Sequence, residues 1–82
     1  AGRYLRASVT IAFDTERDKQ IVKSSSSRVR DGILLLLSGK TAEKLLAPEG
    51  KTELRDEIVE RINAAVAADV ASTVYFREFL IQ

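Results

Sequence analysis

The last thirteen residues, from Val70 to Gln82, constrain the fold more than any other stretch of the sequence. They hold three of the chain's five aromatic residues and contain no Gly or Pro. Val, Tyr, Phe and Ile suit a pleated, partly buried surface, so this stretch is predicted to be a strand. Regular alternation places apolar residues on both faces of the strand. A strand that is apolar on both faces is covered on both faces, here by helices or by a neighbouring protein.

Arg77 and Glu78 stand among the apolar residues of this strand. A buried charge needs a partner. The partner of Arg77 lies either within the fold or across a subunit interface, where Arg and Tyr are enriched. Both alternatives stay open at the level of sequence. Tyr75, Arg77 and Phe79 are therefore candidate interface residues.

The first half of the chain predicts a strand followed by helix. Residues 3–13 alternate between apolar and more polar side chains, which indicates a strand with one buried face. Residues 16–38 have helical apolar spacing, and Asp14 or Thr15 is placed to cap that helix. Four serines, Ser24 to Ser27, interrupt the apolar stripe. They indicate either a broken helix or a continuous one whose small residues let another backbone approach, so Ser25 and Ser26 are also candidate interface residues.

The second half predicts two more helices. Gly39 is a natural helix end, and Thr41 can cap a short helix over residues 42–47 in which Leu45 and Leu46 turn inward. The segment 48–50, Pro-Glu-Gly, is predicted to be a turn. A helix over residues 52–67 follows. It carries one apolar stripe, formed by Leu54, Ile58, Ile62, Ala65 and Val66.

These elements predict a single α+β domain of residues 1–82 with the order β-α-α-α-β. Two long helices and one short helix would pack on a short sheet, whose strands run antiparallel if they are adjacent. A two-stranded sheet is poorly stable in isolation. We therefore expect that either a strand preceding residue 1 or another chain completes the sheet.

Composition argues against most kinds of chemical site. The chain has no Cys and no His, which removes the thiol nucleophile and the commonest general base and metal ligand. The segment 38–41, Ser-Gly-Lys-Thr, lacks the earlier glycine of a phosphate-binding loop, because that position is Leu34. The net charge is +1 with interleaved basic residues, which argues against nucleic acid as a partner. No catalytic, cofactor-binding or metal-binding residue is predicted, and no enzymatic activity.

Several segments resemble one known family. Residues 74–82, V-Y-F-R-E-F-L-I-Q, resemble the ending V-Y-F-T-E-F-V-I-Q of the flagellar basal-body-associated FliL family. Residues 29–38, V-R-D-G-I-L-L-L-L-S, are similar to its I-R-D-A-I-L-L-L-L-S, and residues 40–50 to its K-T-A-E-D-L-L-x-P-E-G. Residues 54–63 follow its L-R-x-E-I-x-x-x-I-N, and residues 2–6 its G-R-Y-L-R. Arg77 departs from the family pattern, which commonly has a small polar residue there.

The resemblance implies a location and a role. The chain would be the periplasmic domain of a single-pass inner-membrane protein of the flagellar basal body, without its N-terminal transmembrane helix, linker and first strand. The domain would be similar to the SPFH core of stomatin-like scaffold proteins, which form rings. Its partners would be other copies of itself and the MotA/MotB-type stator, whose recruitment, stability and torque it would support in swimming or swarming. An SPFH-like membrane scaffold unrelated to flagella is the alternative.

Overall fold

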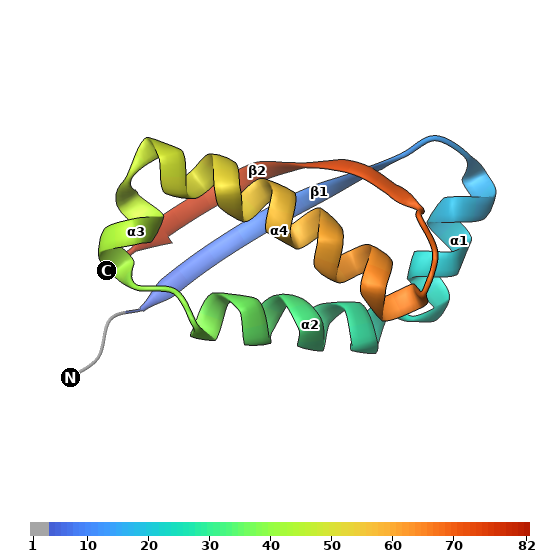
Figure 1. Ribbon diagram of the computed structural model, residues 1–82, viewed down its shortest axis with the longest axis horizontal. Coiled ribbons are helices and arrows are strands. Elements are labelled where there is room, and N and C mark those ends of the chain that lie inside the picture. Colours follow the sequence, from blue (N-terminus) through green and yellow to red (C-terminus); the bar gives the residue numbers. More distant parts are fainter. Residues whose placement is uncertain (1–3) are drawn as a thin grey trace.

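The two strands come from opposite ends of the chain and form one antiparallel sheet (Figure 1). The computed structural model describes residues 4–82. Strand β1 (Leu5–Phe13) runs beside β2 (Ala71–Ile81), with Leu5 opposite Ile81 and Phe13 opposite Ala71. The predicted antiparallel pairing is confirmed. The four helices lie between the strands in sequence, which gives the predicted α+β class.

The serine segment divides the first long helical stretch into two helices, α1 (Glu16–Ser24) and α2 (Ser26–Ser38). Thr15 caps α1, its Oγ1 accepting a hydrogen bond from the Asp18 amide at 3.0 Å. Ser25 leaves the helical conformation with φ −116° and ψ 26°. Serine hydroxyls compete for backbone groups and weaken a helix interior. The broken-helix alternative is therefore confirmed, and the continuous helix is wrong.

Two further helices, α3 (Ala42–Leu46) and α4 (Pro48–Val66), follow the predicted capping residue Thr41. Thr41 Oγ1 accepts a hydrogen bond from the Lys44 amide at 3.2 Å. The predicted turn over residues 48–50 is wrong, because Pro48 instead opens α4. Proline suits the first helical position, where its missing N–H has no intrahelical partner to lose. The inward position predicted for Leu46 is also wrong, because this side chain is 53% exposed.

The core lies between the sheet and α4. Leu54, Ile58 and Ile62 of α4 and Val74 of β2 are almost completely buried. Helix α4 packs on β2, and α2 packs beside α4. The predicted apolar stripe of α4 thus forms the centre of the domain. The remaining buried side chains surround it, namely Val22, Val29, Leu36, Leu45, Val70 and Ala71.

Asn63 connects the end of α4 to the start of β2. Its Oδ1 accepts hydrogen bonds from the amides of Val70 at 2.9 Å and Ala71 at 2.8 Å. Its Nδ2 donates to Asp69 Oδ1 at 3.2 Å and to the Ala71 carbonyl at 3.3 Å. Helix α4 itself ends at Ala67, which is left-handed with φ 54°. This side chain and this backbone reversal together direct β2 back across the sheet.

The helices of the described region do not include a candidate membrane span. None of those within residues 4–82 combines the length and the apolar character required to cross a bilayer.

Candidate interaction surfaces

A β-bulge at Arg77 changes which side chains of β2 face the core. The register pairs Ser8 with Glu78 but Val9 with Phe76, so Arg77 is an extra residue on β2. A bulge leaves one residue without a partner and interrupts the alternation of the strand. The apolar residues that pack on the core are consequently Val74 and Phe76 before the bulge, and Phe79 and Ile81 after it.

The bulge corrects the prediction that β2 is apolar on both faces. Because the alternation shifts by one residue, four large apolar side chains share the core-facing side. Tyr75 and Leu80 remain exposed, at 56% and 43% of their surface. Regular alternation had divided these residues between two faces. One layer of helices therefore covers these apolar side chains, whereas the sequence pattern predicted that both faces of β2 would need to be covered.

The face of the sheet that points away from the core is called the outer sheet surface. It is made up of Tyr75, Glu78 and Leu80 of β2 with Arg6 and Thr10 of β1. Tyr75 lies opposite Thr10, and Leu80 opposite Arg6. Arg6 Nε forms an exposed ion pair with Glu78 Oε1 at 3.2 Å. This surface is a mixture of one aromatic, one aliphatic and several polar or charged groups. Such a composition suits a protein contact rather than a chemical site.

Arg77 and Glu78 are exposed, so the expectation that they are buried charges is wrong. The ion pairs within residues 4–82 are Arg6–Glu78 and Lys40–Glu57, and Arg77 takes part in neither. The physical reason is the bulge, because it leaves Arg77 without a partner on β1 and sets Glu78 opposite the exposed Ser8. Arg77 therefore carries an exposed charge beside Tyr75 and the Arg6–Glu78 pair.

Phe79 is separated from the other candidate residues of β2. Its ring packs edge-on against Phe76, with the centroids 5.3 Å apart. Lys51 Nζ lies 5.4 Å from the Phe79 centroid, within cation–π range. Phe79 is half-buried on the helical side of the sheet. The structure thus places Tyr75 on the outer sheet surface, Arg77 at the bulge and Phe79 within the fold.

Ser25 and Ser26 lie at the junction of α1 and α2, away from Tyr75. The four serines and Arg28 line a shallow hollow there. Ser24 Oγ donates to the Gln20 carbonyl at 2.9 Å, and the Ser25 amide donates to the Val22 carbonyl at 3.0 Å. These bonds complete the last turn of α1. The serines therefore have a local role in ending a helix, beside any role in an interface.

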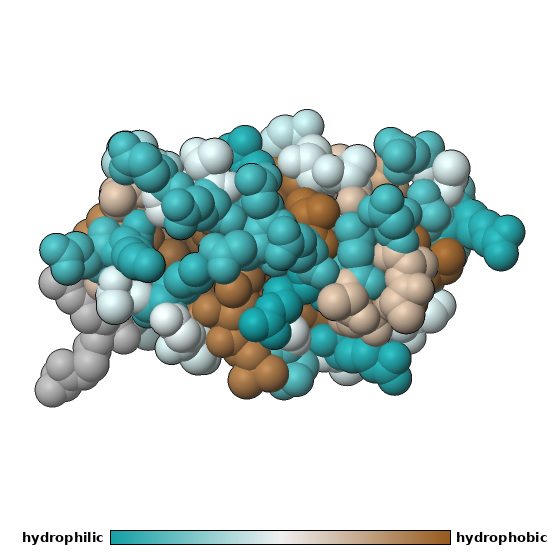
Figure 2. All heavy atoms as spheres, viewed as in Figure 1, coloured by the Kyte–Doolittle hydropathy of each residue, from teal (hydrophilic) through white to brown (hydrophobic). Residues whose placement is uncertain are grey.

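A groove between α2 and β1 is the second open surface, and we call it the α2–β1 groove. Its wider part has a volume of about 480 Å³, and a smaller part of about 320 Å³ continues it toward the start of β1. Both parts share Ala7, Leu34 and Leu37. Leu34 and Leu35 are 57% and 60% exposed. Figure 2 shows an apolar patch over the C-terminal half of α2, where these leucines lie.

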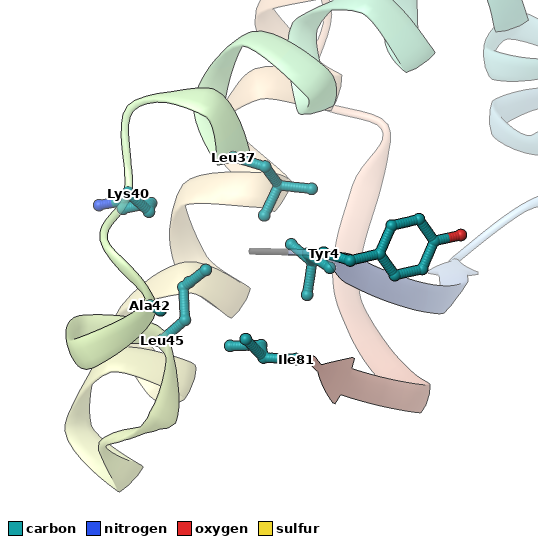
Figure 3. A pocket seen from close by; sticks show the side chains of 7 residues that line it. Tyr4, Leu37, Lys40, Ala42, Leu45 and Ile81 are labelled. Carbon is teal, nitrogen blue, oxygen red and sulfur yellow. The ribbon is translucent and has the colours of Figure 1, made fainter. Parts of the chain in front are cut away.

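A small pocket lies at the end of the domain where α3 meets the sheet (Figure 3). Leu37, Leu45 and Ile81 point toward its interior from three different elements. Lys40 lies at its rim, and its Nζ bonds both Glu57 carboxylate oxygens, at 2.7 and 2.9 Å. Because the charge of Lys40 is already paired, the pocket is an apolar junction between α2, α3 and the sheet.

The residues that the structure describes do not form a cluster of metal-ligating side chains or a phosphate-binding loop. Within residues 4–82, no three Asp or Glu side chains come close enough to hold a metal ion. The segment 38–41 joins two helices, as expected for a turn rather than a phosphate-binding loop. Asn63 is the polar residue that sequence reasoning missed. The available signal was its place beside Ile62, near the end of α4 and shortly before Asp69.

Residues 4–82 form an α+β domain of four helices and a two-stranded antiparallel sheet. Comparison with known proteins defines the family. The family model described as flagellar basal body-associated protein FliL matches residues 1–82. The chain is also 34% identical over 79 residues to the flagellar protein FliL of Aquifex aeolicus (strain VF5). That alignment covers 96% of this chain and 49% of the relative, so the chain spans about half the length of the relative. The chain belongs to the FliL family, which confirms the resemblance seen in its motifs.

Proposed function

We propose that the protein is a non-enzymatic accessory protein of the flagellar motor that binds the MotA/MotB-type stator and self-associates into a ring. The role would be to support stator recruitment, stability and torque during swimming or swarming. Membership of a flagellar basal-body family along the whole chain is the observation that carries this proposal. The same match favours a flagellar role over an SPFH-like scaffold unrelated to flagella.

We place the domain in the periplasm, on a single-pass inner-membrane protein. The membrane helix and linker would belong to the part of the protein outside the 82 residues. The relative of about twice the aligned length supports this arrangement, because it leaves room for such segments. A membrane anchor would also raise the local concentration of the domain, which favours self-association.

The outer sheet surface and Arg77 are the proposed contact with a neighbouring subunit or the stator. Tyr and Arg are the residues most enriched where truncation weakens protein interfaces. Tyr75 and Arg77 are both exposed, so a partner would remove them from water without rearranging the core. Ser25, Ser26 and Phe79 stay predictions as interface residues, and Phe79 would have to act from a half-buried position.

Cross-linking of the full-length protein in its own membrane tests the proposal. A photoreactive residue at Tyr75 should capture a MotA/MotB-type stator protein or a second copy of this protein. The same group at Arg55, which is exposed on α4, provides the matched control. Capture of neither partner from position 75, in membranes that contain assembled motors, would refute the proposed contact.

Substitution of Arg77 tests the self-association directly. Arg77→Ala should weaken ring formation by the anchored protein more than it lowers the melting temperature of the domain. An equal loss of stability and assembly would place Arg77 within the fold instead. Strictly monomeric particles of the unsubstituted protein at high local concentration would exclude the ring.

A further inference from the structure

The large apolar groups of the outer sheet surface lie in a line along β2. Tyr75 and Leu80 are 56% and 43% exposed. They lie opposite Thr10 and Arg6, which are four residues apart on β1. Because a strand rises about 3.3 Å per residue, these two side chains are about 13 Å apart along the sheet. The surface therefore offers two apolar contact points on one line.

Shorter side chains accompany this line on β1. Ser8 and Thr10 are exposed and share the face of Arg6, because alternate residues of a strand point to the same side. Both are smaller than Tyr75 and Leu80. The surface is therefore higher along β2 than along β1, and an elongated partner can rest against β2 while it lies above the small residues of β1.

An α-helix is the element that fits such a face. The backbone groups of a sheet lie in its plane, so a strand laid across the face would find no partners there for its own N–H and C=O groups. A helix bonds its backbone internally and is about 10–12 Å wide with its side chains. The other face of this sheet already receives a helix in this way, because α4 packs on β2.

The described helices of a second copy do not carry the required pattern. The sides of α1 and α4 that face solvent are charged, with Arg17, Lys19 and Lys23 on α1 and Glu53, Asp56 and Glu60 on α4. Helix α3 has five residues and is about 7.5 Å long, which is too short for both contact points. Helix α2 exposes Leu34 and Leu35 at one point, but two turns earlier its exposed side chains are Ser27 and Arg28.

We infer that the outer sheet surface binds one amphipathic α-helix of a different protein, which lies along β2. The inference rests on the proposed contact at this surface and states which kind of element makes it. A helix rises about 1.5 Å per residue, and its residues seven, eight or eleven positions apart lie on nearly the same side. The helix should therefore carry an apolar stripe two to three turns long, with one end on Tyr75 and the other on Leu80.

The charges between the two contact points define the polar part of this helix. Arg6 Nε pairs with Glu78 Oε1 at 3.2 Å, and Arg77 takes part in no ion pair within residues 4–82. One carboxylate thus accompanies two guanidinium groups at the middle of the surface. An Asp or Glu is therefore expected beside the apolar stripe of the helix, where it would approach Arg77.

Photocross-linking at two positions measures the spacing of the partner's residues. Benzoylphenylalanine replaces Tyr75 in one full-length variant and Leu80 in another, in membranes that contain assembled motors, and the linked peptides are sequenced. Both variants should link to one segment of one foreign protein, at residues about 7–11 positions apart. An extended segment would place these residues only about four positions apart. The same group at Arg55, which is exposed on α4, is the control and should not link to this segment.

The possible results separate this inference from the proposed stator contact. Stator peptides linked about four positions apart, or in two unrelated segments, would refute the helix and leave the stator contact standing. A spacing of about 7–11 positions in a protein other than the stator would support the helix and remove the stator. Links to a second copy of this protein, or no links, would overturn the inference.

A bulky residue on β1 gives an independent test. Ser8→Trp fills the low side of the surface and should reduce the yield of the cross-link from position 75 by about tenfold. Ser27→Trp changes an equally exposed serine on α2 and should leave this yield unchanged. Because both positions are exposed, both variants should melt at nearly the temperature of the unsubstituted protein. Equal yields from the two variants would show that no element lies above Ser8 and would overturn the inference.

Discussion

Asn63 binds Ala71 through both backbone groups of that residue. Its Oδ1 accepts from the Ala71 amide at 2.8 Å, and its Nδ2 donates to the Ala71 carbonyl at 3.3 Å. The Asn63 side-chain amide thus makes two hydrogen bonds to Ala71 of the kind that the backbone of a neighbouring strand makes. The same oxygen also accepts from the Val70 amide. One residue on α4 therefore fixes where the C-terminal strand starts.

Replacement of Asn63 should destabilise the domain. Asn63→Ala leaves the partly buried Val70 and Ala71 amides without an acceptor and is expected to lower the free energy of unfolding by about 2–3 kcal/mol. Urea unfolding followed by circular dichroism measures the change. Gln20→Ala is the control, because its exposed bond to Glu16 spans 3.4 Å and should contribute little. Equal effects of the two substitutions would disprove the role of Asn63.

The left-handed residue at the end of α4 gives a stabilising substitution. Ala67 has φ 54°, a conformation that costs an alanine more than a glycine. Ala67→Gly should raise the free energy of unfolding by about 1 kcal/mol. Ala64→Gly, three residues earlier on the exposed side of α4, should lower it by about 1 kcal/mol. Thermal melts of the two variants should move in opposite directions, and a common direction would contradict the assigned backbone conformation.

Gly50 allows α4 to approach α3 closely. A Cβ at this position would collide with the Lys44 carbonyl, whereas a Cβ at Gly39 would make ordinary contact at 3.6 Å. Gly50→Ala should therefore cost at least about 2 kcal/mol through displacement of the backbone. Gly39→Ala, whose φ of −87° suits any residue, should cost well under 1 kcal/mol. Chemical denaturation compares the pair, and a larger loss for Gly39→Ala would be inconsistent with this packing.

The bulge predicts that the domain tolerates both replacement and deletion of Arg77, because this residue has no partner on β1. Arg77→Ala removes an exposed side chain and should change the free energy of unfolding by no more than about 0.5 kcal/mol. Deletion of Arg77 makes Phe76 and Glu78 adjacent, so regular alternation keeps Phe79 and Ile81 on the core-facing side, and the deletion should cost no more than about 1 kcal/mol. Equilibrium unfolding of both variants measures the two changes. A loss of about 3 kcal/mol or more on deletion would mean that the bulged backbone itself is required.

Local chemistry predicted the helices and strands well. Thr15 and Thr41 cap helices as their side chains suggested, and the stripe of Leu54, Ile58 and Ile62 forms the core. The start of α4 was missed because Pro-Glu-Gly is typical of turns, although proline equally suits the first turn of a helix. Composition alone does not separate these two uses of proline.

Features that depend on contacts between residues far apart in the sequence could not be predicted from the sequence. The bulge at Arg77 arises from the register between β1 and β2, which requires both strands in place. For the same reason, Arg77 was expected to be buried. The partner of Glu57 is Lys40, seventeen positions away, and only the fold brings these two residues together. The separation of Phe79 from Tyr75 likewise follows from the bulge and not from local sequence.

The bulge also changes whether the even-numbered or the odd-numbered residues of β2 face the core. Before Arg77 the core-facing large residues have even numbers, Val74 and Phe76, and after it they have odd numbers, Phe79 and Ile81. In a scan of every substitution along the strand, intolerance to polar residues should follow even positions and then odd ones. An ungapped alignment of this strand with a strand that lacks the bulge therefore exchanges inner and outer residues after position 77, whereas a gap at position 77 keeps them matched. A second shift, between Ala12 and Phe13, leaves Ser72 as another extra residue, so β2 consists of three short registers joined at Ser72 and Arg77.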